Sequence, residues 1–144
     1  MAEDSGAQAN RQPSDEELRY MYGVYQQQHS LISNTINMHM QDLQELNAAQ
    51  KTLESSDTIS NREILTNIGA DFFMKSKLAD AETVIVGIGS DYMVEKDIDS
   101  AKAFVAKKIE AKMNIVNQLG KNRKELEGAM VDIGYKLGQT AGRA

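Results

Sequence analysis

A short strand-rich stretch, Arg62 to Lys96, separates two long segments whose apolar residues recur every three or four positions. Within it, β-branched and aromatic runs are interrupted by Gly69, by Asp80 and by the cluster from Gly87 to Asp91. Runs bounded in this way predict four short strands joined as two hairpins. Both faces of Thr83 to Ile88 are apolar, and four short strands cannot cover two faces and two open edges. We therefore expect this stretch to pair with other chains.

The segment before the strands has the heptad pattern of a coiled-coil helix. Ser14 is its predicted N-cap, and Glu17 three residues later completes a capping box. Ser55 to Thr58 ends the pattern. Its seam positions alternate in steps of four and three and are Leu18, Tyr22, Tyr25, His29, Ile32, Ile36, His39, Leu43, Leu46, Gln50 and Leu53.

The segment after the strands repeats this pattern, with Asp97 or Asp99 as the predicted N-cap. At ~1.5 Å per residue each helix would be on the order of 60 Å long. Equal lengths joined by a compact insert predict an antiparallel pair. The second seam consists of Ile98, Lys102, Val105, Ile109, Lys112, Val116, Leu119, Arg123, Leu126, Met130, Ile133 and Leu137.

Charge supports the pairing of the two segments. Residues 14–57 carry seven acidic and two basic residues, whereas residues 101–124 carry seven basic residues and one acidic residue. Opposite charges favour pairing between the segments over self-association of either one. In the expected register Asp42 can accept the ammonium of Lys112.

The predicted fold is mainly α: a long antiparallel coiled-coil hairpin with two small β-hairpins at its closed end. Residues 1–13 are expected to form a disordered tail, 14–57 the N-terminal helix, 58–96 the β-hairpin assembly region, and 97–144 the C-terminal helix and tail. The predicted assembly residues are Ile64, Leu65, Ile68, Phe72, Phe73, Val84, Ile85, Val86 and Ile88.

Composition argues against several function classes. A net charge of -5 disfavours nucleic-acid binding, and the absence of cysteine removes thiolate chemistry and zinc-thiolate sites. No apolar run is long enough for a membrane span and the N-terminus has no secretory pattern, so we expect a cytoplasmic protein.

His29 and His39 lie about 15 Å apart along one helix, too far to share a metal. Gly87-Ile88-Gly89 lacks the rest of a nucleotide-binding motif. We predict no cofactor, no metal and no enzymatic activity.

The open end of the predicted coil carries more apolar residues than a two-helix seam needs. Gly23, Gly128, Gly134 and Gly138 fall in the same region, and each weakens a helix by about 1 kcal/mol relative to alanine. Exposed apolar residues on a loose tip suit an adaptable binding surface, although ordinary coil packing at frayed ends would also account for them. The candidate residues of this binding surface are Met21, Tyr22, Val24, Tyr25, Met130, Ile133, Tyr135 and Leu137.

The hairpin region resembles a known family. Asn67-Ile-Gly-Ala-Asp-Phe-Phe-Met-Lys-Ser-Lys-Leu78 and Val84-Ile-Val-Gly-Ile-Gly-Ser-Asp-Tyr-Met-Val-Glu-Lys-Asp-Ile-Asp-Ser-Ala101 are similar to the paired hairpins of alpha-type subunits in the archaeal-type prefoldin (GimC) family. With the flanking helices, the resemblance extends from about Glu16 to Leu137. The family pattern would have proline at Asn67 and glycine at Asp71, both in the first hairpin turn.

This resemblance implies a function that the residue pattern alone does not. It implies two alpha subunits assembled with four prefoldin beta subunits through β-barrels, with the coils projecting from the barrels. It further implies an ATP-independent chaperone that holds unfolded client proteins at the coil tips and delivers them to a group II chaperonin. Two alternatives stay open: a self-assembling prefoldin-like paralogue, and a structural coiled-coil tether without chaperone activity.

Overall fold

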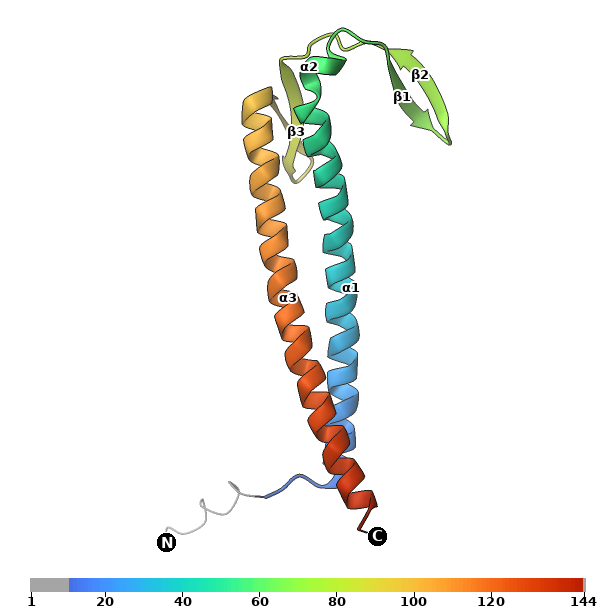
Figure 1. Ribbon diagram of the computed structural model, residues 1–144, viewed down its shortest axis with the longest axis vertical. Helices are drawn as coiled ribbons and strands as arrows, with labels where there is room; N and C mark the ends of the chain where they lie inside the picture. The colour runs from blue at the N-terminus through green and yellow to red at the C-terminus, as the bar shows by residue number, and fades with distance from the viewer. Residues whose placement is uncertain (1–10, 144) are drawn as a thin grey trace. The chain divides into compact units, whose positions relative to one another are not determined.

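The computed structural model describes residues 11–143 and is mainly helical, as predicted (Figure 1). Most of the predicted tail at 1–13 lies outside the described residues. The chain order is α1 (Asp15–Glu54), α2 (Ser56–Ile59), β1 (Ile64–Gly69), β2 (Phe72–Ser76), β3 (Thr83–Gly89), β4 (Tyr92–Asp97) and α3 (Ile98–Ala141). The sequence predicted one helix over 14–57, whereas α1 ends at Glu54 and the one-turn helix α2 follows it.

The chain divides into two compact units, and both long helices contribute to each. The terminal unit consists of Met1–Met38 and Asn117–Ala144, of which 11–38 and 117–143 are described. The hairpin unit is His39–Val116 and contains α2 and all four strands. Each unit therefore has its own pair of helical segments and its own small core.

Polar side chains fix the starts of both long helices. The amide of Ser14 donates to Glu17 Oε2 at 2.7 Å, and the amide of Glu17 donates to Ser14 Oγ at 3.2 Å. This reciprocal pair confirms the predicted capping box. Asp97 Oδ2 accepts the amide of Ser100 at 3.1 Å, so Asp97 rather than Asp99 is the N-cap of α3.

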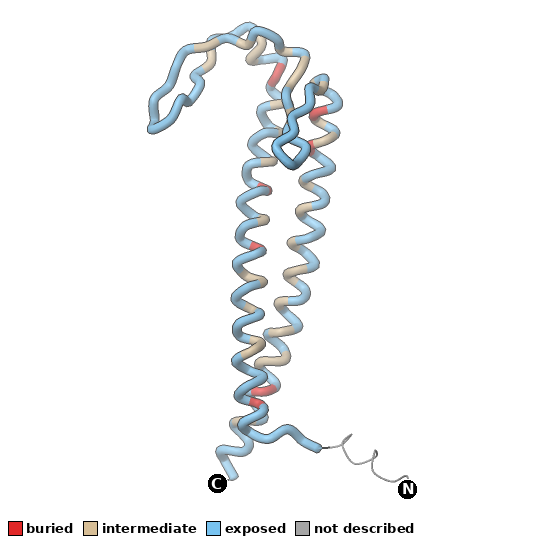
Figure 2. Tube along the Cα trace, turned by 180° about the vertical axis from the view of Figure 1, so that it is seen from behind, coloured by how far each residue is buried: buried red, intermediate tan, exposed pale blue. Residues whose placement is uncertain are grey.

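The predicted seams form the core of each unit. In the terminal unit Leu18, Ile36 and Ile133 are buried, and in the hairpin unit Leu43 and Val105 are buried (Figure 2). Along α3 every predicted seam residue is at least half-buried; along α1 the same holds except for Tyr22, which lies at the margin of exposure. The heptad pattern therefore predicted which face of each helix packs inward.

The four strands form two separate antiparallel hairpins, β1–β2 and β3–β4, as predicted. In the first, Leu65 pairs with Lys75, and in the second, Val86 pairs with Val94. Both registers shift by one residue near the turn, between Asn67 and Gly69 and between Gly87 and Gly89. The extra residue is an isoleucine in each case, Ile68 or Ile88, which makes a β-bulge that increases local twist.

The two hairpin turns have nearly the same backbone. Gly69, Ala70 and Asp71 have φ angles of 116°, 47° and 61°, and Gly89, Ser90 and Asp91 have 114°, 49° and 62°. Positive φ at both central residues is what a type I′ turn requires. Asp71 therefore reaches the left-handed conformation where the family pattern would have glycine.

The other departure from the family pattern also fits this turn. Asn67 Oδ1 accepts the amide of Gly69 at 2.7 Å, a bond that proline could not make.

Candidate assembly and binding surfaces

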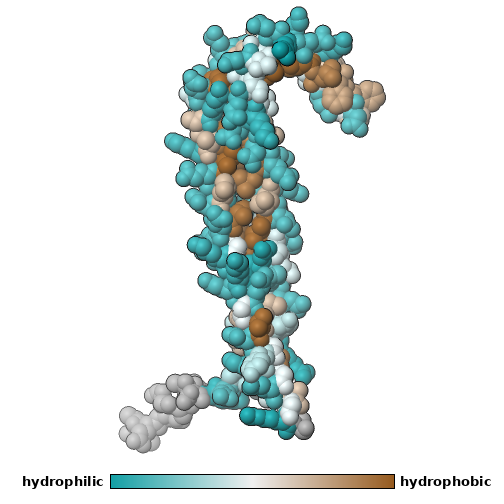
Figure 3. Space-filling view, in the orientation of Figure 1, coloured by the Kyte–Doolittle hydropathy of each residue, from teal (hydrophilic) through white to brown (hydrophobic). Residues whose placement is uncertain are grey.

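The first hairpin presents its apolar side chains to solvent. Phe72 is 69% exposed and Leu65 is 66% exposed, and Ile68, Phe73 and Met74 are also exposed. Figure 3 shows hydrophobic colour on this hairpin, and Figure 2 shows exposure along both of its strands. Exposed apolar side chains on a two-stranded ribbon are unfavourable in water and indicate a surface that another chain covers.

The second hairpin packs against the helices of its own unit. Val84 and Val86 are half-buried beside a groove that the two long helices line. The helical residues of this groove include Leu46, Leu53, Ala101, Phe104 and Val105. Because β3 turns one face toward this groove, its opposite face stays open, and Ile85 is 73% exposed.

The nine predicted assembly residues therefore fall into two groups. Ile64, Val84 and Val86 are half-buried within this chain. The others are exposed: Leu65, Ile68, Phe72, Phe73, Ile85 and Ile88. Sequence reasoning left out further exposed apolar residues on the second strand of each hairpin, Met74, Tyr92, Met93 and Val94. Of these four, only Val94 pairs directly opposite a predicted residue, Val86, and the register would have identified it.

The predicted client-binding residues all lie in the terminal unit. Met21, Tyr22 and Tyr135 are exposed, and Val24, Tyr25, Met130 and Leu137 are half-buried. Ile133 is buried in the seam. Tyr20 and Val131 were not among the predicted residues, yet they are 75% and 71% exposed. We call the exposed and half-buried set the end surface; it comprises Tyr20, Met21, Tyr22, Val24, Tyr25, Met130, Val131, Tyr135 and Leu137.

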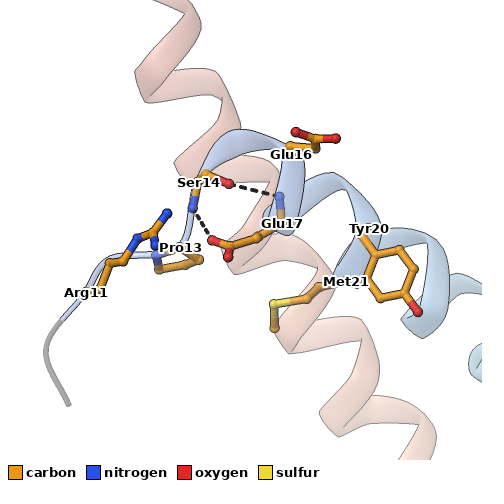
Figure 4. A pocket seen from close by; sticks show the side chains of 7 residues that line it. All are labelled: Arg11, Pro13, Ser14, Glu16, Glu17, Tyr20 and Met21. Carbon is orange, nitrogen blue, oxygen red and sulfur yellow. Dashed lines mark hydrogen bonds between the residues drawn. The ribbon is translucent and has the colours of Figure 1, made fainter. Parts of the chain in front are cut away.

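A shallow hollow beside the start of α1 borders the end surface (Figure 4). Its polar side is the capping box, in which the Ser14 amide lowers the pKa of the Glu17 carboxyl. Its apolar side includes Tyr20 and Met21. A second hollow is lined by residues from the beginning of α1, such as Leu18, and from the end of α3, such as Thr140. Residues at the two ends of the described chain therefore contribute to one region.

In each unit, polar side chains of the two long helices contact each other, and a histidine takes part. In the terminal unit His29 Nε2 lies 2.8 Å from Glu127 Oε1, and the hydrogen bond from His29 lowers the pKa of Glu127. In the hairpin unit the Lys112 ammonium donates to Asp42, as the sequence predicted, and this bond lowers the pKa of Asp42. Lys112 Nζ also lies 3.2 Å from His39 Nδ1. These contacts favour the observed pairing of α1 with α3.

Within residues 11–143, no three acidic or histidine side chains come together as a metal would require. In that same range, neither long helix is apolar enough over a sufficient length to cross a membrane. Both hairpins and the end surface expose several large apolar side chains. Open strand edges and exposed aromatic and aliphatic side chains are features typical of surfaces that bind other polypeptides.

Comparison with known proteins identifies the family. The family model for "Prefoldin subunit" matches residues 25–142. Prefoldin subunit alpha of Pyrococcus horikoshii is 30% identical over 131 residues, covering 90% of this chain and 84% of that protein. Prefoldin subunit alpha 1 of Thermococcus kodakarensis is 35% identical over 95 residues, covering 65% of each protein. This chain therefore belongs to the prefoldin family, whose members are chaperone-type subunits.

Solved structures agree on the fold. The prefoldin beta subunit from Thermococcus strain KS-1 matches with a TM-score of 0.61 and 18% identity, over 91% of this chain and 95% of that one. Filamentous PFD from Methanocaldococcus jannaschii matches with a TM-score of 0.59 and 19% identity, over 88% of this chain and 99% of that one. At these identities the similarity establishes the fold alone.

Proposed function

We propose that this protein is the alpha-type subunit of a hetero-oligomeric holding chaperone. In this proposal both hairpins join those of prefoldin beta subunits in shared β-barrels, with two alpha subunits and four beta subunits in each complex. The observation that carries the proposal is the exposure of Leu65, Phe72 and Phe73 on a ribbon with two open edges. Strand pairing with a partner would cover both the edges and these side chains.

The end surface is the proposed contact site for unfolded clients. Unfolded chains present scattered apolar segments, and aromatic residues such as Tyr20 and Tyr135 offer large contact areas at a small cost in side-chain entropy. Each contact would be weak, but several subunits in one complex would add their contacts through effective concentration. This binding needs no nucleotide. The protein would act in the cytoplasm and would pass its clients to a group II chaperonin.

Trimming the terminal unit tests the client site. A variant without 1–25 and 130–144 loses the whole end surface, while the hairpin unit keeps all its residues. With purified prefoldin beta subunit, the trimmed chain should form a complex of the same subunit count by native mass spectrometry. Its suppression of aggregation of a chemically denatured client enzyme should fall sharply, with and without ATP. Equal protection by trimmed and full-length complexes would place client binding elsewhere.

Delivery needs its own assay. A client held by the full-length complex should refold after addition of a group II chaperonin and ATP, and should refold poorly with ATP alone. A client that folds equally well in both cases would contradict delivery to the chaperonin.

Self-assembly is the second candidate, because the open edges of the first hairpin could pair with another copy of this chain. The native mass of the chain alone decides between the two. Homo-oligomers that persist in the presence of beta subunit would favour the self-assembling paralogue. A chain that assembles but gives no protection to any of several clients would support the tether.

A further inference from the structure

The strand β3 has an outer edge whose backbone groups can be identified from the pairing. The amide of Ile98 donates to the carbonyl of Glu82 at 3.1 Å, so these two residues form a hydrogen-bonded antiparallel pair. Such pairs alternate with pairs whose backbone groups point away from the partner strand. Counting along the register from Thr83–Asp97 to Gly87–Met93, the carbonyls of Thr83, Ile85 and Gly87 point to the free edge of β3.

Lys108 on α3 occupies part of this edge. Its ammonium donates to the carbonyl of Gly87 at 3.2 Å. The same ammonium lies 4.8 Å from the centroid of the Phe104 ring, one helical turn earlier, within the range of a cation–π contact. Lys96 on β4 lies 5.3 Å from the same ring. Phe104 therefore contacts one cation from the helix and one from the hairpin.

These contacts place a charged donor where a neighbouring strand would donate its amide. A strand that pairs along the outer edge of β3 must bring an N–H group to the Gly87 carbonyl. It would have to displace the Lys108 ammonium from that carbonyl, and a charged hydrogen bond is stronger than a neutral one. Lysine at strand edges is a common protection against unwanted pairing.

We propose that Lys108 guards the outer edge of β3 in the unassembled chain. The guard suppresses pairing between copies of this chain, and a partner strand releases it by donating its own amide to Gly87. The partner is thus an extended strand from an assembly subunit that supplies enough further contacts, for example with the exposed side chain of Ile85, to displace the ammonium. The inference rests on the proposed assembly through the hairpins, because the edge must be free before assembly.

Replacement of Lys108 in the isolated full-length chain tests the guard. Lys108→Met keeps the aliphatic stem and removes the donor, so the association constant for self-assembly should rise by roughly tenfold, the equivalent of ~1.4 kcal/mol. Sedimentation equilibrium over a range of concentrations measures this constant. Lys108→Arg keeps a charged donor and should restore the low association of the original chain. Lys107→Met, at the exposed neighbouring position, removes the same charge and should leave the constant unchanged.

The outcomes separate the guard from its alternatives. No rise with Lys108→Met overturns the proposal, provided that circular dichroism shows unchanged helicity. An equal rise with Lys107→Met would assign the effect to lost surface charge and also overturns it. If Lys108→Met loses helicity, hydrogen exchange of the Val84 and Val86 amides in Lys108→Arg gives a second measurement, in which loss of protection contradicts the guard and retained protection supports it. Failure of the client assay would leave these readouts unaffected, so the guard and the chaperone function can fail separately.

Discussion

The two hairpins have nearly identical turns and very different surroundings. Each has a bulged isoleucine, a glycine at positive φ and an aspartate in the left-handed region. Yet Val84 and Val86 of the second hairpin pack beside the helical groove, whereas Leu65, Phe72 and Phe73 of the first face solvent. The same local structure therefore serves one hairpin that its own chain supports and one that has its apolar residues available to a partner.

The second hairpin is also tied at its base by polar contacts. The Thr83 hydroxyl donates to Asp80 Oδ2 at 2.6 Å, and the Glu82 amide donates to Asp80 Oδ1 at 2.8 Å. Asp97 is both the last residue of β4 and the N-cap of α3. The geometry of the second hairpin is thus linked to the start of α3. A partner would therefore bind a second hairpin that its own chain already holds in place, and would cover the exposed apolar residues of the first hairpin.

A charge in the middle of the second hairpin should have the largest effect on assembly and on the stability of the chain. Val86→Asp places a carboxylate against the helical groove, and burying an unpaired polar group costs on the order of 1–3 kcal/mol. We expect loss of assembly with beta subunit by native mass spectrometry and a lower thermal midpoint of the isolated chain, with the helices retained. The matched control Ile85→Asp changes an exposed residue and should impair assembly with little effect on that midpoint. Unchanged mass in Val86→Asp would show that the hairpins are not the interface.

The first hairpin should show the opposite pattern. Replacing Phe72 and Phe73 by serine removes exposed side chains, so the free energy of unfolding of the isolated chain should change by no more than about 0.5 kcal/mol. Binding of beta subunit, measured by titration calorimetry, should weaken by more than tenfold. Lys75→Gln on the same strand is the control and should bind normally. A large loss of stability in the double variant would mean that the first hairpin already packs within its own chain.

Acid should loosen the second hairpin more than the first. The side-chain hydrogen bond from Thr83 lowers the pKa of Asp80, and Ser100 lowers the pKa of Asp97. A carboxyl with a lowered folded pKa stabilises the fold above its unfolded value of about 3.9, and this contribution is lost as pH falls through the folded value. Protection factors of the β3–β4 amides should therefore decrease below about pH 4. The double variant Asp80→Asn, Asp97→Asn should lack this decrease, and an identical pH profile in both proteins would contradict the assignment.

The smallest expected effect concerns the turns themselves. Ala70 takes a positive φ that costs alanine roughly 1 kcal/mol, whereas asparagine tolerates it. Ala70→Asn should therefore stabilise the first hairpin by about 0.5 kcal/mol, visible as slower hydrogen exchange in β1 and β2. Ser90→Asn at the equivalent position of the second hairpin should have a similar effect. If only Ser90→Asn slows exchange, the two turns are not equivalent in solution.

The residue pattern determined the local structure of this protein. Heptad spacing predicted the buried faces of both long helices, Ser14 and Glu17 predicted the start of α1, and the register of the seams predicted the contact of Asp42 with Lys112. Glycine and aspartate spacing predicted both hairpins. These features depend on interactions within a few residues or on a period that repeats along a helix, and both can be recognised in a linear sequence.

Only the tertiary structure decided how the two hairpins differ. Phe72, Phe73, Val84 and Val86 are all apolar strand residues, and their pattern does not indicate which of them pack on α1 and α3. That outcome depends on the groove between the helices, which Ala101 helps to line, and on the reach of Lys108 to a carbonyl 21 residues earlier in the chain. These contacts join residues that are not related by any short sequence period. The shape of the surface between two packed helices depends on the side chains of both helices, so neither sequence segment alone predicts it.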